Sequence, residues 1–148
     1  MKLERLPIAE IGRLHEIDVG AQSEPWVREA EHFLFGGELA EFARRYQDEL
    51  FIWTLGEDGV IVAVGVEYPD QRFEAIRLGV IVVDQRHRGR GLGSIVLHEL
   101  VSTHVAKGTT ALWLVHPLNR SMLKCSRRLE PKPDEATVSD GYIMFVAP

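Results

Sequence analysis

The chain has 148 residues, enough for one domain with a substantial hydrophobic core and too few for two ordinary domains. Its 45% hydrophobic content is typical of a soluble globular protein. Its net charge of -5 argues against nucleic acid as the main partner. Its single cysteine, Cys125, excludes an intrachain disulfide framework. No apolar run is long enough for a membrane span and the N-terminus lacks a secretory pattern, so we expect one domain over residues 1–148 in the reducing cytoplasm.

The first third of the chain predicts one short strand and two helical regions. Residues 2–6 are expected to form the strand, and the apolar residues spaced three apart over 8–17 suit a helix. After a loop, residues 26–46 form a second helical region, which Gly36-Gly37 interrupts.

Residues 49–83 then predict three consecutive β-strands. The first two, 49–55 and 60–68, are joined by the hairpin turn Gly56–Gly59. A second turn at Pro69-Asp70 leads to the third strand, 73–83. Together they form an antiparallel meander.

The last third returns to alternating helices and strands. A helix over 91–107 ends at Gly108, and the strand that follows, 110–115, should lie parallel to the strand before the helix. Asn119 is expected to cap a short helix. That helix should turn Met122, Cys125 and Leu129 inward, and strands near 135–138 and over 142–146 should complete the chain. The predicted class is α/β (α+β), with a mixed, mainly antiparallel sheet of six to seven strands and about four helices.

The stretch Val80–Ile95 carries the strongest functional signal. Val80–Val83 predicts a buried strand, and a basic turn, Arg86–Arg90, follows it and opens the next helix. Gly89, Gly91 and Gly93 let the backbone approach a ligand, while the helix N-terminus offers unpaired N–H groups. The pattern predicts a site for the pyrophosphate of a cofactor.

Two common phosphate motifs do not fit this turn. A P-loop ends in Gly-Lys-Ser/Thr, whereas Gly93-Ser94 has no lysine between its residues. The dinucleotide motif requires G-x-G-x-x-G and an acidic residue after the next strand; the chain has G-x-G-x-G and Val115-His116 instead. A flexible turn with solvated arginines is the remaining alternative.

Arg88-Gly-Arg-Gly91-Leu-Gly93 resembles the Arg/Gln-x-x-Gly-x-Gly/Ala signature of the GNAT superfamily of acyl-CoA-dependent N-acyltransferases. Val83 fits the valine at the family's strand end, and Asn119 resembles the asparagine that begins its second cofactor segment. The resemblance implies a sheet splayed at the CoA site, acetyl-CoA as co-substrate and no metal. The implied cofactor-binding residues are Ile81, Val82, Val83, Arg88, Gly89, Arg90, Gly91, Gly93, Ser94 and Asn119.

The catalytic residues do not follow the family pattern as closely. Where the family often has a tyrosine as general acid, seven residues after the asparagine, the chain has Ser126. Where N-terminal protein acetyltransferases often have a glutamate, the chain has Leu114. The alternatives for the base are His116, Glu67 or a relay of ordered waters. A backbone N–H near Ile81 or Val82 is expected to bind the oxyanion.

The family builds its acceptor pocket around the loop between the first helices, so Trp26 is the candidate substrate-binding residue. The resemblance implies an N-acetyltransferase acting on an amine of a small molecule, a peptide or a protein. A non-catalytic acyl-CoA-binding module is the alternative, and nucleotide binding without CoA is a weaker one. Neither nucleic acid nor membrane is an expected partner; a homodimer stays open.

Overall fold

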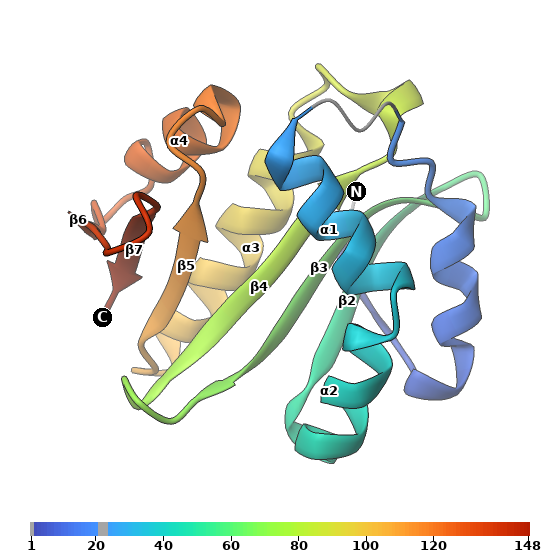
Figure 1. Cartoon of the computed structure of the whole chain (residues 1–148), viewed down its shortest axis with the longest axis horizontal. Helices are drawn as coiled ribbons and strands as arrows, with labels where there is room; N and C mark the ends of the chain where they lie inside the picture. The colour runs from blue at the N-terminus through green and yellow to red at the C-terminus, as the bar shows by residue number, and fades with distance from the viewer. Residues whose placement is uncertain (1, 21–23) are drawn as a thin grey trace.

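The computed structural model describes residues 2–20 and 24–148. Its elements are β1 (Glu4–Leu6), η1 (Ile8–Glu16), α1 (Pro25–Phe35), α2 (Glu38–Tyr46), η2 (Gln47–Glu49), β2 (Phe51–Glu57), β3 (Val60–Asp70), β4 (Ala75–Val83), η3 (Gln85–His87), α3 (Leu92–Ala106), β5 (Ala111–Val115), α4 (Arg120–Arg127), β6 (Asp134–Thr137) and β7 (Ile143–Ala147), where η marks a 3₁₀ segment. Their order confirms the predicted alternation of strands and helices (Figure 1).

The strands form one mixed sheet in the described part of the chain. Its seven strands lie in the order β1-β2-β3-β4-β5-β7-β6. Every neighbouring pair is antiparallel except β4 and β5, which the β4-α3-β5 connection makes parallel. The predicted mainly antiparallel α/β sheet is therefore confirmed.

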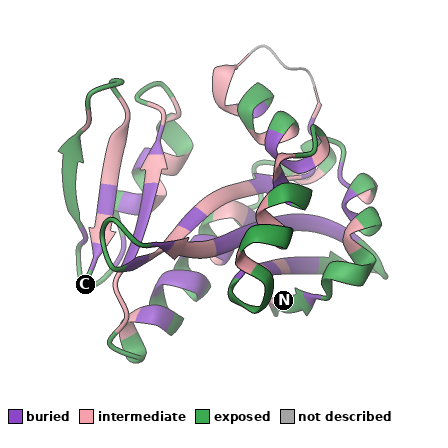
Figure 2. Ribbon diagram, turned by 60° about the horizontal axis from the view of Figure 1, so that its bottom comes forward, coloured by how far each residue is buried: buried purple, intermediate pink, exposed green. Residues whose placement is uncertain are grey.

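Helices cover both faces of this sheet. The helices α1 and α2 pack on one face with η1, and α3 packs on the other (Figure 1). The strands between them carry much of the buried surface (Figure 2). A Cβ atom at Gly65 of β3 would lie 2.8 Å from Val96 Cγ1 of α3, so glycine allows this helix to lie close to the sheet.

The sheet opens between β4 and β5. The two strands pair only at Ile76–Ala111 and Arg77–Leu112, and beyond Arg77 they diverge. On the other side of β4, the pairing with β3 shifts register between Val66 and Glu67, which leaves Gly79 without a partner in a β-bulge. The predicted splay is thus present, and a bulge marks its beginning.

Three local expectations differ from the structure. Pro69 and Asp70, expected in a turn, instead end β3 and pair with Ile76 and Ala75. Residues 8–16 are 3₁₀ rather than α-helical, with a non-helical kink at Glu10, and the three-residue apolar spacing matches the period of a 3₁₀ helix. In α4 the buried residues are Leu123 and Ser126. Of the residues expected to face inward, Leu129 is buried, while Met122 and Cys125 are partly buried and pack against the core. The helix is therefore rotated by about one residue from the predicted orientation. Among the described residues, none of the helices is long and apolar enough to cross a membrane.

Candidate functional site

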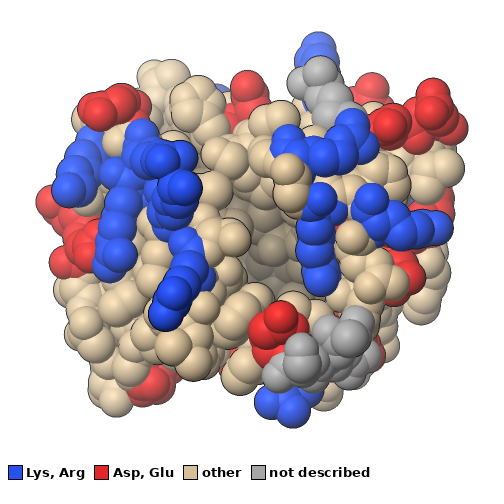
Figure 3. All heavy atoms as spheres, turned by 90° about the horizontal axis from the view of Figure 1, so that it is seen from above, with Lys and Arg blue, Asp and Glu red and all other residues tan. Residues whose placement is uncertain are grey.

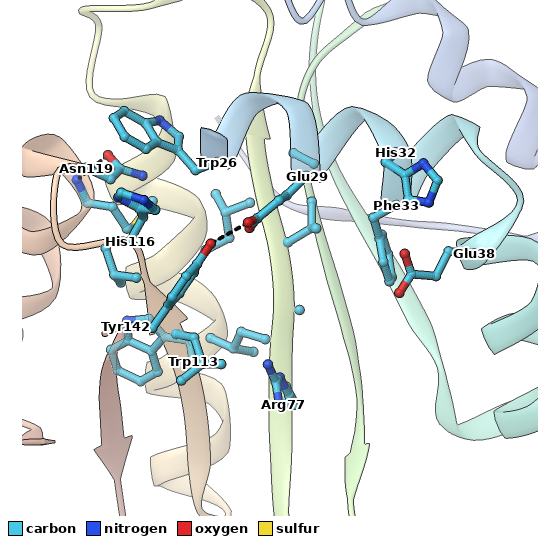
Figure 4. Close-up of a pocket in the computed structure, with 18 of the residues that line it drawn as sticks. Trp26, Glu29, His32, Phe33, Glu38, Arg77, Trp113, His116, Asn119 and Tyr142 are labelled. Carbon is cyan, nitrogen blue, oxygen red and sulfur yellow. Dashed lines mark hydrogen bonds between the residues drawn. The ribbon is translucent and has the colours of Figure 1, made fainter. Parts of the chain in front are cut away.

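A cavity of about 380 Å³ lies at the opening between β4 and β5. Helix α1 forms one wall, the splayed parts of β4 and β5 form the floor, and the segment before β7 closes the remaining side (Figure 4). Its lining includes Trp26, Glu29, His32, Phe33, Glu38, Arg77, Trp113, His116, Asn119 and Tyr142. The cavity therefore combines aromatic surface with a few charged side chains, as ligand sites commonly do.

A hydrogen bond crosses the cavity from α1 to the segment before β7. The Tyr142 hydroxyl donates to Glu29 Oε1 at 2.5 Å (Figure 4). Burial, followed by this bond to Glu29, raises the pKa of the Tyr142 phenol. The phenol therefore keeps its proton at neutral pH, and the Glu29 carboxylate accepts it as a hydrogen bond.

His116 lies between the aromatic rings of Trp26 and Tyr142. Its ring centroid is 5.1 Å from that of Trp26 and 5.3 Å from that of Tyr142. The Leu118 backbone N–H donates to His116 Nδ1 at 3.1 Å, which assigns the hydrogen of the neutral ring to Nε2. With the Nδ1 lone pair occupied, the neutral imidazole offers a donor rather than a free base.

The glycine-rich turn lies beside this cavity, where β4 leads into α3. Gly89 and Gly91 have φ of +81° and +76°, and a Cβ atom on either would meet nothing within 4 Å. The first hydrogen bond of α3 runs from Ile95 N to Gly91 O, so the earlier N–H groups of the helix point outward without helical partners. Such an open N-terminus fits a phosphate group.

Basic side chains surround the entrance to this region. From above the view of Figure 1, the surface is hollowed between two basic groups, one over α4 and one over the turn around η3 (Figure 3). The group on α4 comprises Arg120, Lys124, Arg127 and Arg128. The two groups thus place positive charge on either side of this hollow (Figure 3).

Comparison with known families identifies the family of the chain. A model of the acetyltransferase (GNAT) family matches residues 12–129. The chain belongs to the GNAT family. A comparison with curated proteins gives no significant match.

Solved structures agree with the GNAT fold. The chain is similar to the ribosomal-protein-S18-alanine N-acetyltransferase of Escherichia coli, with a TM-score of 0.72 and 20% identity over 99% of this chain and 92% of that one. It is similar to PaiA N-acetyltransferase of Thermoplasma acidophilum in complex with coenzyme A, with a TM-score of 0.70 and 14% identity over 99% of this chain and 98% of that one. A ribosomal-protein-alanine N-acetyltransferase of Brucella melitensis gives a TM-score of 0.68 and 15% identity over 99% of each chain. At these identities the likeness establishes the fold alone.

In this GNAT chain the arginines of the turn bind other parts of the protein. Arg88 donates to the Val19 carbonyl at 2.7 Å, and Arg90 pairs with Glu57 at 2.9 Å. Arg86 pairs with Asp84 at 2.8 Å. Their guanidinium groups therefore hold the turn in place, and the unpaired N–H groups at the start of α3 are left to face a ligand.

Asp84 is the buried centre of the turn. Its side chain has 0% exposure and accepts hydrogen bonds from Asp18 N at 2.8 Å and Arg86 N at 2.9 Å. The Arg86 guanidinium, and then these backbone donors, hold the Asp84 pKa well below its usual range despite burial. Gln85 adds a bond from its side-chain amide to Asp18 Oδ2 at 2.6 Å. The turn is thus fastened to the segment that leads towards α1.

The structure brings most predicted cofactor residues to one region. Ile81 and Asn119 line the cavity, and Asn119 also caps α4 by accepting from Met122 N at 3.3 Å. A Cβ on Gly93 would lie 3.6 Å from Val83 Cγ2, which places the start of α3 against the end of β4. Val82 is buried in the core beneath α1, and Ser94 is exposed in the first turn of α3.

Among the candidates for catalysis and substrate binding, only His116 and Trp26 line the cavity. Glu67 lies outside it, paired with His104 of α3 and bonded to Trp53 Nε1 at 2.9 Å. Ser126 is fully buried and accepts from Trp113 Nε1 at 2.9 Å. The rotation of α4 explains the position of Ser126, because it puts this residue on the buried face.

Sequence reasoning missed Glu29, Tyr142, Asp84 and the bulge at Gly79. A glycine inside a strand pattern predicts a bulge or a close contact, and a Cβ on Gly79 would indeed lie 2.5 Å from Tyr68 Cε1. An aspartate two residues before a turn amide predicts the bond from Arg86 N to Asp84. The pairing of Glu29 with Tyr142 has no local signal.

Proposed function

We propose that the protein is an N-acetyltransferase that transfers the acetyl group of acetyl-CoA to an amine bound in the cavity. The observation that carries the proposal is the cavity at the β4–β5 splay, next to an open glycine turn, in a chain of the GNAT family. A solved neighbour in complex with coenzyme A supports the choice of cofactor. The N–H groups at the start of α3 would hold the pyrophosphate, and Asn119 and Ile81 would border the pantetheine arm.

The reaction is attack of a neutral amine on the thioester carbonyl, so the protein must stabilise an oxyanion, accept a proton and assist the thiolate. Beyond Arg77, β4 has no partner on its β5 side, and we assign the oxyanion to a backbone N–H there, near Ile81 or Val82. Glu29 is the proton acceptor, because Tyr142 binds one of its two carboxylate oxygens, Oε1, whereas the one basic nitrogen of His116 in this tautomer, Nδ1, is occupied. Tyr142, whose phenol stays protonated, gives its proton to the leaving thiolate and regains a proton from Glu29 through their hydrogen bond. Glu67 and Ser126 receive no role in transfer.

Acetyl-CoA at 100 times its dissociation constant should stabilise the fold by about 2.7 kcal/mol, which raises the melting temperature by about 5–10 °C. A thermal melt with and without acetyl-CoA measures this shift. Release of free thiol across a panel of amines then measures transfer. If saturating acetyl-CoA leaves the melting temperature unchanged, the proposal is wrong. Stabilisation without thiol release would support the non-catalytic acyl-CoA-binding module instead.

Replacing Glu29 with glutamine should lower kcat about a hundredfold or more, because the amide cannot take the proton. Tyr142→Phe should cost only about tenfold, since a thiol with a pKa of about 8.5 leaves tolerably as the thiolate. The raised Tyr142 pKa also means that wild-type kcat should not decline from tyrosine ionisation below about pH 10. Steady-state kinetics from pH 6 to about pH 10 test these expectations. The control is Glu41→Gln on the exposed surface of α2. Equal rates in Glu29→Gln and the control would refute the assignment.

A further inference from the structure

Arg77 lies in the wall of the cavity with an unused hydrogen-bond donor. It belongs to the last residue pair that joins β4 and β5, and its side chain is 24% exposed. Its Nε atom is buried and has no hydrogen-bond partner among the described residues. In the close-up, Arg77 lies at the end of the cavity away from Trp26 and Asn119 (Figure 4). A buried donor of this kind favours a ligand that accepts its hydrogen bond.

The protein supplies only part of the counter-charge that Arg77 needs. Its nearest carboxylate is Asp70, with 3.6 Å between Arg77 Nη1 and Asp70 Oδ2. Asp70 is shared with Arg72, whose Nε lies 3.5 Å from Asp70 Oδ1. No described residue therefore accepts from the Nε edge of the Arg77 guanidinium. When the side chain, 24% exposed, turns this edge into the cavity, it presents two parallel donors that match a carboxylate.

The rest of the cavity selects the charge of the ligand. Glu29 and Glu38 both line it, so an ammonium group is favoured and a doubly charged phosphate is repelled. Between Arg77 and the splayed end of β4, the Tyr68 ring packs against Gly79 and gives the floor a flat aromatic surface. An acceptor with a singly charged carboxylate at Arg77 and an amine near Glu29 matches the charge at each end of the cavity.

We propose, on the basis of the transfer reaction above, that Arg77 binds the carboxylate of the acceptor and that the acceptor is a short peptide with a free C-terminus. From Arg77 to Ile81, near which the oxyanion is assigned, β4 advances about 13 Å. An extended tripeptide spans about 10 Å between its amine and its carboxylate, and a hydrogen bond of about 3 Å from Arg77 supplies the rest. Arg77 thus sets the length and the charge of the acceptor.

The test compares trialanine with trialanine amide, which differ only in the C-terminal charge. Calorimetric titration into CoA-saturated protein should show the free acid binding about 10 to 100 times more tightly, as expected for hydrogen bonds to a charged group. In Arg77→Met this preference should fall to within about twofold. Arg72→Met is the matched control, because Arg72 shares Asp70 but is 74% exposed and lies outside the cavity. It should keep the full preference.

The outcomes separate this inference from the proposed function. Equal binding of the two peptides, or an unchanged preference in Arg77→Met, overturns the role of Arg77. Thiol release with other amines but not with trialanine overturns the peptide acceptor. Absence of thiol release with every amine overturns the proposed function, while the titration still judges Arg77. If Arg77→Met does not fold, Arg77→Lys decides: it keeps the charge but loses the two parallel donors, so its preference should fall below that of the wild type, and an unchanged preference overturns the inference.

Discussion

Replacing Asp84 with asparagine is expected to lower the free energy of unfolding by about 2–3 kcal/mol. The carboxylate is fully buried and accepts from two backbone N–H groups and from the Arg86 guanidinium. An asparagine amide would turn two donor hydrogens towards some of these donors and leave them unsatisfied. Because the same bonds fasten the glycine turn to Asp18, affinity for CoA should fall as well. Urea unfolding and titration with CoA measure the two effects.

The pH dependence of stability should show whether the ionised Asp84 carboxylate is the source of this loss. The folded-state pKa of Asp84 is depressed, so its contribution is complete above the unfolded value of about 3.9 and is lost as the pH falls below it. The wild type and Asp84→Asn should therefore differ most near neutral pH and converge in acid. A difference that persists undiminished at the lowest pH at which the protein folds would contradict the ionised carboxylate as its source.

Arg86→Gln is the control for the Asp84 substitution. The Arg86 side chain is 61% exposed, so its pair with Asp84 should contribute about 1 kcal/mol or less. The backbone donors should therefore account for most of the Asp84 effect. Equal losses in Asp84→Asn and Arg86→Gln would show instead that the ion pair carries the stability of the turn.

Most of the fold was predictable because its signals are local. The hairpin between β2 and β3 follows from Gly56–Gly59, where Asp58 and Gly59 indeed have positive φ. The interruption at Gly36-Gly37 separates α1 from α2 as expected. The rotation of α4 was not predictable, since its apolar residues leave two orientations open and packing against α3 selects between them.

The candidate site likewise contains residues with a local sequence signal and residues without one. Trp26, His116 and Asn119, three of the predicted site residues, line the cavity, and each lies next to an element boundary that the sequence marks. Glu29 and Tyr142 are 113 residues apart, and only the assembled sheet brings them together. Glu67 is buried in a largely apolar strand, and its partner His104 lies 37 residues further along the chain. Burial follows from a local pattern, whereas a partner across the sheet does not.

Gly91→Ala should abolish most CoA binding while leaving the protein folded. Gly91 precedes α3 with φ of +76°, a conformation that costs an L-residue about 1–2 kcal/mol. A methyl group there would meet no protein atom within 4 Å, so backbone strain is the whole cost to the unliganded fold. The same methyl group would occupy the surface that the pyrophosphate must approach. Loss of one or more N–H bonds to a charged phosphate should weaken binding by at least about tenfold.

Gly108→Ala is the control that separates backbone strain from obstruction of CoA binding. Gly108 follows the C-terminal end of the same helix, has φ of +72°, and also has no protein atom within 4 Å of an added Cβ. Both variants should therefore unfold at similarly reduced urea concentrations, because both place alanine in the left-handed region. Only Gly91→Ala should lose affinity in a titration with CoA. If the two variants bound CoA equally well, the glycine turn would not be the pyrophosphate site, and the basic group on α4 would be the next place to look for it.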